Sequence, residues 1–265
     1  MRLSTAAIGL LSALPTAVQC WGSLGHISVA YISTNFVQDE TARYFKGLLR
    51  NDTNDYLAGV ATWADSIRYT KWGRFTAGFH YIDAHDEPPT YCGVDFDRDC
   101  KKDGCIISAL QNYTNQLLDG NLVAWRRMQP LHTENVLQGG NGIHVKWEDA
   151  DLNLHHVWDS SIAEKMLGGI HRKPYPAALE WAANLSTEIR TETSMKWASE
   201  SNTHVCESVL PQGASAIVGQ ELAFGEYYET AVPVIELQVA KAGYRLAKWL
   251  DLIAERISVQ ALDEL

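Results

Sequence analysis

The chain has 265 residues, enough for one large domain or two small ones with a substantial hydrophobic core. It carries 22 Lys and Arg against 32 Asp and Glu, a formal net charge of −10, and 46% of its residues are hydrophobic. This composition excludes a disordered or collagen-like chain. The negative net charge argues against a protein that binds nucleic acid through a broad basic surface. It does not argue against an enzyme that binds phosphate through metal ions.

The first 20 residues have the pattern of a secretory signal peptide. Arg2 precedes an apolar run over residues 6–18, and Val18 and Cys20 occupy positions −3 and −1 of a cleavage site. The run is too short to cross a bilayer, and the alternative is a buried N-terminal helix. Cleavage would leave residues 21–265 as one domain that begins at Trp21. No later stretch of the sequence is long and apolar enough for a membrane span, so we expect a secreted, extracellular protein.

Four cysteines remain after residue 20: Cys92, Cys100, Cys105 and Cys206. An even count in a secreted chain implies disulfides, and four cysteines allow three pairings. Cys100 and Cys105 flank a short loop and are natural partners, which leaves Cys92 for Cys206. Three N-x-S/T sequons also agree with secretion and predict glycosylation at Asn51, Asn112 and Asn184.

The spacing of apolar residues predicts a mainly helical chain. We expect helices over 25–37, 108–118, 153–167 and 176–190. The last segment has an apolar stripe at a helical period: Ile235, Val239, Ala242, Leu246, Leu250 and Ile253. Residues 83–104 are rich in Gly, Pro and Asp and predict a long loop, and the glycines of 139–142 predict a tight turn before a short strand at 143–147. The sequence contains no repeat or linker, so we expect one mainly α domain.

Several His and Asp residues are candidate metal ligands. His155 and Asp159 are spaced i and i+4, which puts an imidazole and a carboxylate on one face of a helix, as in zinc sites. His26 lies five residues after the predicted N-terminus, so the α-amine and carbonyl of Trp21 could chelate a metal together with it. Further isolated ligands are Asp65, His80 and His132. For each residue taken alone, the alternative is an ordinary core or surface position.

These residues lie in five motifs: Trp21-Gly22-x-x-Gly25-His26, Thr62-Trp63-Ala64-Asp65, His80-Tyr81-Ile82-Asp83-Ala84, Gln129-Pro130-Leu131-His132 and Asn153-Leu154-His155-His156-Val157-Trp158-Asp159. Together the motifs resemble the zinc-dependent single-strand nucleases of fungi and plants, which share their fold with bacterial zinc phospholipases C. The resemblance covers essentially the whole chain after residue 20. It implies a disulfide-stapled helical domain, a monomer without membrane attachment, that holds three Zn²⁺ ions in a cleft and cleaves single-stranded DNA and RNA.

The resemblance also implies a role for each candidate. The first zinc site matches Asp65 and His80, the second matches His132, His155 and Asp159, and the third matches Trp21 and His26. Clustered cations bind the scissile phosphate and lower the pKa of a water, and cleavage leaves 5′-phosphates. The catalytic residues that the resemblance implies are Asp65 and Arg68. Arg68 matches an arginine that stabilises the transition state. Tyr81 and Asp83 match positions that bind the base beside the cleaved bond, which must be unstacked to enter.

One segment departs from the family pattern, which reads His-x-x-Gly-Asp-x-His-Gln-Pro-Leu-His. Here Met128 precedes the final Gln-Pro-Leu-His132, and residues 118–127 contain neither a His nor a Gly-Asp pair. The segment 112–132 is about three helical turns short. The missing residues include one His of the first zinc site and the Asp that bridges the first and third. Either the protein lacks this segment or a mistaken splice has removed it from the sequence.

Three functions are therefore open. The first is a secreted zinc endonuclease whose activity is lowered by the missing ligands, with about one zinc per chain at His132, His155 and Asp159. The second is a catalytically inactive nuclease-like protein that binds nucleic acid or another partner. The third is a phospholipase C. It is disfavoured by Asp159, where that branch is expected to have Glu, and by the base-binding positions Tyr81 and Asp83.

Overall fold

The computed structural model describes residues 21–118, 130–169, 174–185 and 194–263. The predicted signal peptide, residues 1–20, lies outside these ranges. So do residues 119–129, which include most of the segment that departs from the family pattern. Within the described residues, none of the helices combines the length and the apolar character that a membrane span requires.

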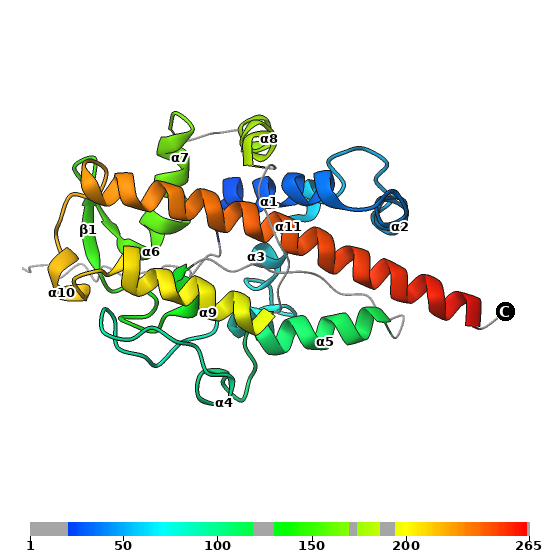
Figure 1. The fold of residues 1–265 in the computed structure, drawn as a ribbon, viewed down its shortest axis with the longest axis horizontal. Helices are drawn as coiled ribbons and strands as arrows, with labels where there is room; N and C mark the ends of the chain where they lie inside the picture. The colour runs from blue at the N-terminus through cyan, green and yellow to red at the C-terminus, as the bar shows by residue number, and fades with distance from the viewer. Residues whose placement is uncertain (1–20, 119–129, 170–173, 186–193, 264–265) are drawn as a thin grey trace, which may run out of the picture.

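The chain is mainly helical, with one small hairpin (Figure 1). The α-helices are α1 (Ser23–Phe36), α2 (Asp39–Leu49), α3 (Trp63–Ile67), α4 (Phe96–Asp99), α5 (Ile106–Leu118), α6 (Leu154–His156), α7 (Ile162–Met166), α8 (Pro174–Leu185), α9 (Ser194–His204), α10 (Ala214–Ile217) and α11 (Glu226–Asp263). Short 3-10 turns are η1 (Ala58–Val60), η2 (Arg74–His80) and η3 (Pro130–Thr133), and π-helical turns are η4 (Val157–Ser161) and η5 (Val205–Val209). Strands β1 (His144–Trp147) and β2 (Ala150–Asn153) pair antiparallel.

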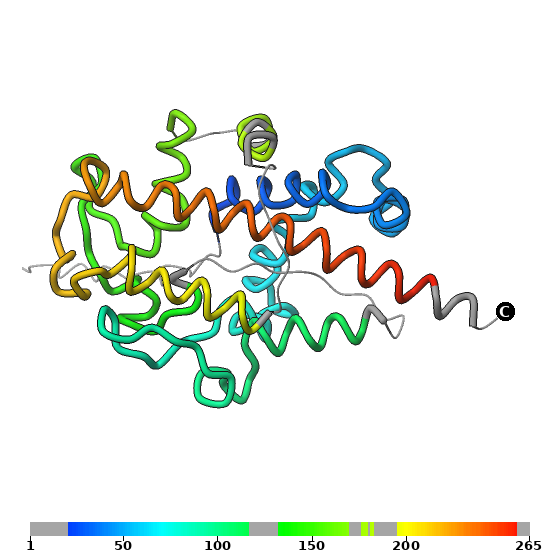
Figure 2. The backbone as a smooth tube through the Cα atoms, viewed as in Figure 1, coloured from blue at the N-terminus to red at the C-terminus, as the bar shows by residue number. Residues whose placement is uncertain are grey.

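Helix α11 crosses the whole molecule (Figures 1 and 2) and packs against α1, α2, α5, α7, α8 and η5. Its predicted stripe faces the core: Ile235, Val239 and Leu250 are fully buried. Helix α1 lies against it and is buried on nearly all sides from Leu24 to Ser33, as expected for a helix inside a core. The two helices approach closely at Gly243, where a Cβ would overlap the side chain of Ile32.

Most predicted elements are confirmed. Helices α1, α5 and α11 and strand β1 lie where the sequence predicts them, and α8 occupies the predicted range 176–190 as far as residue 185. The predicted helix 153–167 is present but is divided into α6, η4 and α7. Residues 83–104 form the predicted loop, interrupted only by α4.

The sequence did not predict several of the short elements, and for β2, α2 and α9 the reason is local. Strand β2 follows a two-residue turn, Glu148-Asp149, in which both residues have positive φ. Such turns usually contain Asn or Gly, so the sequence carries no signal for this one. Helix α2 is charged and buries only Thr41 and Phe45, and α9 (SMKWASESNTH) consists mostly of polar residues.

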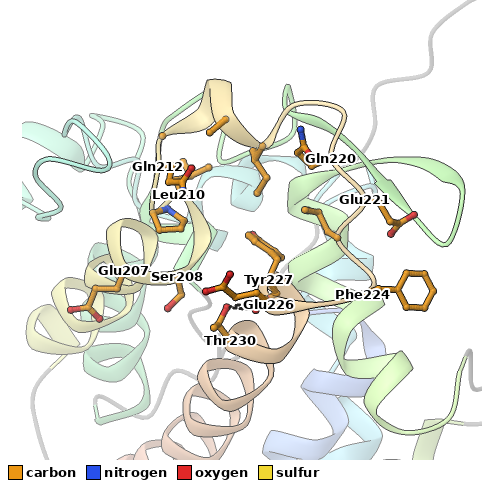
Figure 3. Close-up of a pocket in the computed structure, with 15 residues that line it drawn as sticks. Glu207, Ser208, Leu210, Gln212, Gln220, Glu221, Phe224, Glu226, Tyr227 and Thr230 are labelled. Atoms are coloured by element: carbon orange, nitrogen blue, oxygen red, sulfur yellow. Dashed lines mark hydrogen bonds between the residues drawn. The ribbon is translucent and has the colours of Figure 1, made fainter.

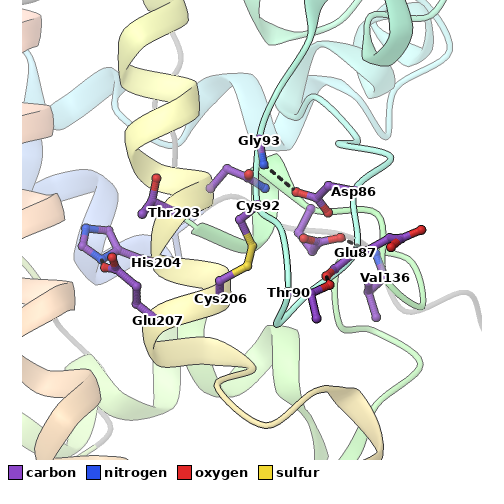
Figure 4. The surroundings of a disulfide bond; sticks show 12 residues. Asp86, Glu87, Thr90, Cys92, Gly93, Val136, Thr203, His204, Cys206 and Glu207 are labelled. Atoms are coloured by element: carbon purple, nitrogen blue, oxygen red, sulfur yellow. Dashed lines mark hydrogen bonds and ion pairs between the residues drawn. A yellow bond between two sulfur atoms is a disulfide. The ribbon is translucent and has the colours of Figure 1, made fainter.

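Both predicted disulfides are confirmed. Cys92–Cys206 joins residues 114 positions apart and ties the long loop to η5 (Figure 4). Cys100–Cys105 closes the end of that loop. Cys105 also belongs to a small second hydrophobic cluster with Ile82, Ile106, Ile107, Leu110 and Ala198. The loop is therefore fastened both covalently and by its own core.

The carboxylate of Asp99 organises the same loop from inside, with its side chain fully buried. It accepts hydrogen bonds from the backbone N–H of His85 (3.1 Å) and Asp95 (2.8 Å) and from Nε (2.6 Å) and Nη2 (2.8 Å) of Arg98. Burial alone would raise the pKa of Asp99, but Arg98 and the two amides outweigh it and lower the pKa below its usual value.

Candidate metal and nucleotide site

Three of the predicted ligands converge in one buried cluster. His132 of η3, His155 of α6 and Asp159 of η4 place their ligand atoms within 4.8 Å of one another. Nε2 of His132 lies 3.6 Å from Oδ1 of Asp159, and Nε2 of His155 lies 3.2 Å from Oδ2. We call these residues the His132 cluster. The i, i+4 spacing thus brings His155 and Asp159 together as predicted, on a chain that has π-helical hydrogen bonding at Asp159, a feature frequent at functional sites.

Local contacts fix the orientation of both His155 and Asp159. The Nδ1 of His155 lies 2.6 Å from the carbonyl oxygen of Gly139, which makes Nδ1 the donor and directs the lone pair of Nε2 toward Asp159. The side chain of Asn153 accepts a hydrogen bond from His156 N–H and so caps the start of α6. Burial would raise the pKa of Asp159, but the imidazoles of His155 and His132 outweigh it and hold the pKa at about 2.

A second group of predicted ligands surrounds Asp65. Oδ2 of Asp65 lies 2.8 Å from Nε2 of His26, and Oδ1 lies 3.0 Å from Nδ1 of His80. We call these residues the Asp65 cluster. They come from α1, α3 and the end of η2, and both imidazoles are buried. The three ligands that the sequence scatters over 55 positions therefore do meet.

Two backbone hydrogen bonds hold the clusters next to each other. The N–H of Gly22 donates to the carbonyl of Asp159 (2.9 Å), and the N–H of Ile82 donates to the carbonyl of His132 (2.9 Å). A Cβ at Gly22 would overlap the Oγ of Ser160, so a side chain there would require that hydroxyl to turn away. Trp21, the predicted mature N-terminus, is 1% exposed and therefore lies inside the fold beside Asp159.

Arg68 is buried and is the first residue after α3. Its Nη2 donates to the hydroxyl of Tyr69 (2.7 Å), and its guanidinium carbon lies 4.9 Å from the centre of the Tyr69 ring. Arg68 is 7% exposed and lies one turn after Asp65, so its charge is held close to the Asp65 cluster. The predicted transition-state residue is thus near the predicted ligands.

The predicted base-binding residues are joined by a cation that the sequence did not predict. Lys101 forms an ion pair with Asp83, and its Nζ lies 5.8 Å from the centre of the Tyr81 ring. The hydrogen bond to Asp83 raises the pKa of Lys101. The signal for Lys101 would have been its place between Cys100 and Cys105, because the short disulfide brings that loop back to Asp83.

Glu134 was also missed. It is 1% exposed and its Oε1 accepts hydrogen bonds from the N–H groups of Asn135 (2.7 Å) and Val136 (2.8 Å). Burial, together with the nearby carboxylate of Asp86, raises the pKa of Glu134 to about 8. With Asn202, which donates to the carbonyl of Thr133 (2.7 Å), Glu134 shapes the turn that carries His132. A lone Glu and a lone Asn give no sequence signal of this kind.

The donor set of the His132 cluster fits a zinc ion. Two imidazoles and one carboxylate make up a common ligand set for catalytic zinc, which keeps a fourth position for water or substrate. One imidazole is already oriented by a second hydrogen bond, as is usual for zinc-binding His. In the Asp65 cluster, two imidazoles and one carboxylate are also of the right chemical type.

A hollow of about 500 Å³ lies elsewhere, between α10 and the start of α11 (Figure 3). Its lining includes the carboxylates of Glu207, Glu221 and Glu226 and contains no Lys or Arg. This electrostatic character does not suit a polyanion. The candidate site for phosphate chemistry is therefore the pair of clusters.

Comparisons with known proteins agree with this assignment. The sequence model of the S1/P1 nuclease family matches residues 21–255. Nuclease S1 of Aspergillus oryzae is 44% identical over 90% of this chain and 93% of its own length. Nuclease P1 of Penicillium citrinum is 39% identical over 88% of this chain and 97% of its own length. Endonuclease 3 of Arabidopsis thaliana is 30% identical over 96% of this chain and 95% of its own length.

The alignments also contain a gap on the side of this chain. The alignment with nuclease S1 spans 268 residues, whereas 90% of a 265-residue chain is about 239, so about 29 aligned positions have no counterpart here. The alignment with nuclease P1 spans 266 residues against about 233, which is 88% of the chain. This shortfall is larger than the three helical turns, about 11 residues, that the sequence pattern predicts to be missing. With a family match that runs from Trp21 through most of α11, the chain belongs to the S1/P1 nuclease family.

Proposed function

We propose that this chain is a secreted, zinc-dependent endonuclease that hydrolyses single-stranded DNA and RNA to 5′-phosphorylated products. The observation that carries the proposal is the His132 cluster. Three buried zinc-type ligands lie within 4.8 Å of one another in a member of a nuclease family. A zinc ion held there would polarise a phosphate oxygen and lower the pKa of a water molecule at the open position.

The remaining predicted ligands would hold further zinc. Asp65 and His80 would hold zinc at the first site. Trp21 and His26 would hold zinc at the third site. Because the chain lacks the family's additional His and bridging Asp, these sites have fewer protein ligands than the His132 cluster. We therefore infer that the chain binds about one zinc ion, at the His132 cluster, and that its activity is lower than that of relatives with the full motif.

Residues of the chain itself have defined tasks in this proposal. Arg68 is held in place by Tyr69 and carries a permanent positive charge. This charge would stabilise the negative charge that develops on the phosphate oxygens in the transition state. The ring of Tyr81 offers a face for stacking, and Asp83 and Lys101 offer an acceptor and a donor to a base edge. A base must leave its stack to reach them, and this requirement favours single strands.

Secretion rests on several independent features. The family match begins at Trp21, the residue that follows the predicted cleavage site. Both disulfides are of the kind that persists in oxidising compartments. Of the predicted glycosylation sites, Asn112 is exposed on α5, Asn51 lies in the turn after α2, and Asn184 lies near the end of α8. A soluble monomer without membrane attachment remains our prediction.

A second candidate function is that of a catalytically inactive nuclease-like binding protein. The missing His-x-x-Gly-Asp segment favours it, because the loss of a bridging carboxylate removes support for at least one metal ion. Such a protein would still present the surfaces that contact a base.

The two functions are separated by zinc content and hydrolysis, measured on the same secreted protein. We expect about one zinc per chain by elemental analysis and slow hydrolysis of single-stranded DNA and RNA at mildly acidic pH. Asp159→Asn should lose that zinc and the hydrolysis, because the substitution removes the charged ligand. His156→Gln is the matched control, since His156 is exposed on the same helix and belongs to neither cluster.

Two outcomes would contradict the nuclease proposal. The first is a protein that binds zinc and nucleic acid but cleaves neither DNA nor RNA, which would establish the binding protein instead. The second is hydrolysis that Asp159→Asn leaves unchanged, which would remove the His132 cluster from the chemistry.

A further inference from the structure

The short stretch 63–75, next to the candidate site, carries an accumulation of exposed aromatic rings. The exposed fractions are 38% for Trp63, 54% for Tyr69, 64% for Trp72 and 69% for Phe75. Seven aromatic side chains are strongly exposed among the described residues, and four of them lie in this stretch. Single exposed apolar residues need no explanation, but a contiguous group indicates an interaction surface.

These rings contact neighbouring rings and are still exposed to solvent. The centres of the Trp63 and Trp72 rings lie 6.4 Å apart at an interplanar angle of 46°. Phe75 packs edge-on against Phe79 at 6.0 Å, and Phe79 packs against Tyr113 of α5 at 6.1 Å. Rings held in this way lose little side-chain freedom when a ligand stacks on them.

The same stretch is basic, in contrast to the chain as a whole. Residues 66–82 contain Arg68, Lys71 and Arg74 and no Asp or Glu, whereas the whole chain has a net charge of −10. Lys71 and Arg74 are exposed, and within the described part of the chain neither forms an ion pair. Lys101 and Lys146, by contrast, are paired with carboxylates.

The stretch is continuous with the candidate site. Asp65 lies inside it, and Tyr69 contacts Arg68 through both its hydroxyl and its ring. A nucleic acid strand whose phosphate lies at Arg68 therefore meets these side chains as it leaves the site. The acidic hollow near α10 has the opposite charge and offers no such path.

We propose that Trp63, Tyr69, Trp72 and Phe75, with Lys71 and Arg74, form a surface that binds nucleotides of a single strand beyond those at the cleaved phosphate. We call it the aromatic–basic surface. It rests on the proposed function, because its ligand is the substrate of that function. Alternating rings and cations suit a single strand, whose bases are free to stack while its phosphates attract the cations. A duplex keeps its bases stacked on one another and gains only the cations.

Binding of short and long oligothymidylates tests the proposal. The probes are fluorescein-labelled strands of two and of twelve nucleotides with phosphorodithioate linkages, chosen to resist cleavage, and the readout is fluorescence anisotropy on the intact secreted protein. We expect the longer strand to bind more tightly. Trp72→Ala and, independently, Phe75→Ala should each raise the Kd of the longer strand about fivefold or more. Each should also bring the Kd of the longer strand closer to that of the shorter strand.

Salt and a matched variant complete the experiment. Lys71→Ala and Arg74→Ala should each lower the slope of log K against log salt by about 0.7, as for one lost phosphate contact on a single strand. Phe224→Ala is the control, since Phe224 is an aromatic residue of similar exposure (60%) beside the acidic hollow. It should leave both Kd values unchanged.

Three results would overturn the surface: equal Kd values for the two strand lengths, a longer-strand Kd that neither Trp72→Ala nor Phe75→Ala raises, or an equal loss in Phe224→Ala. If the protein nevertheless hydrolyses a short single strand, the proposed function stands and only the surface fails. If it neither binds nor hydrolyses any strand, both fail.

Discussion

The two ligand clusters of this chain are assembled in different ways. In the His132 cluster, two of the three ligands lie four residues apart on one helical segment, and a backbone carbonyl fixes the imidazole of His155. In the Asp65 cluster, each candidate ligand comes from a separate element, and residues 118–127 do not contain the His and Gly-Asp that the family resemblance leads us to expect. The pair His155 and Asp159 keeps its geometry through local helical spacing, whereas every ligand of the Asp65 cluster depends on tertiary contacts between separate elements.

The clusters nevertheless depend on a shared framework. Ile82 donates to the backbone of His132, and Asn202 of α9 donates to Thr133. The Cys92–Cys206 bridge connects the chain that follows Ile82 with η5, directly after α9. The bridge thus joins the loop that follows the Asp65 cluster to the end of α9, the helix that contacts the segment of His132 through Asn202.

The largest effect on stability is expected from removing the Cys92–Cys206 disulfide. Replacing Cys92 and Cys206 by Ser should lower the free energy of unfolding by about 4–5 kcal/mol, because the bridge closes a very long loop. Replacing Cys100 and Cys105 by Ser is the matched control and should cost only about 2 kcal/mol, since that loop is short. Denaturant unfolding measures both. Equal losses would show that loop length does not determine the contribution of these bridges.

Restoring the missing segment should remove the difference between the clusters. A variant with the family's His-x-x-Gly-Asp-x-His segment inserted before Gln129 should raise the zinc content from about one to three per chain. Its hydrolysis of single-stranded DNA should rise by about 10²–10³-fold, by analogy with regaining a transition-state donor. Elemental analysis and a nuclease assay measure the two effects.

The control for this insertion is the same segment with its Asp changed to Asn. This control restores the length of the inserted segment but not the bridging carboxylate, so it should gain little zinc or activity. If the unmodified chain already binds three zinc ions and has full activity, another residue replaces the lost ligands and the comparison between the clusters is wrong.

The sequence predicted what depends on local pattern. The apolar stripe of α11, the i, i+4 pair His155 and Asp159, and the short disulfide all arise from spacing along the chain. What it missed depends on tertiary contacts. Lys101 matters only because the fold returns its loop to Asp83, and Glu134 only because it is buried beside Asp86. The helix α9 is polar in sequence yet fully buries Asn202, which no hydropathy pattern could indicate.

A smaller effect is expected from pushing α1, and with it His26, away from α11. Gly243→Ala places a Cβ against the stiff, β-branched side chain of Ile32, so the free energy of unfolding should fall by about 1–3 kcal/mol. Gly47→Ala is the control, because a Cβ there meets nothing within 4 Å. It should leave the stability unchanged or slightly raised. Thermal unfolding of both variants measures the difference, and equal behaviour would show that the close approach of α1 and α11 is not tight.

An effect of similar size at neutral pH, which shrinks in acid, concerns the loop between the two disulfides. Asp99→Asn should cost about 1–3 kcal/mol at neutral pH, because an amide group cannot accept all the hydrogen bonds that the carboxylate accepts from His85, Asp95 and Arg98. The pKa of Asp99 is lowered in the folded protein, so its contribution is complete above the ordinary value of 3.8 and is lost as the pH falls through the folded pKa. The difference between variant and wild type should therefore shrink in acid. Asp97→Asn, at an exposed position of the same α4, should show no such difference at either pH. A cost for Asp99→Asn that does not shrink at all as the pH is lowered below 3.8 would mean that packing of the side chain, and not its charge, holds the loop.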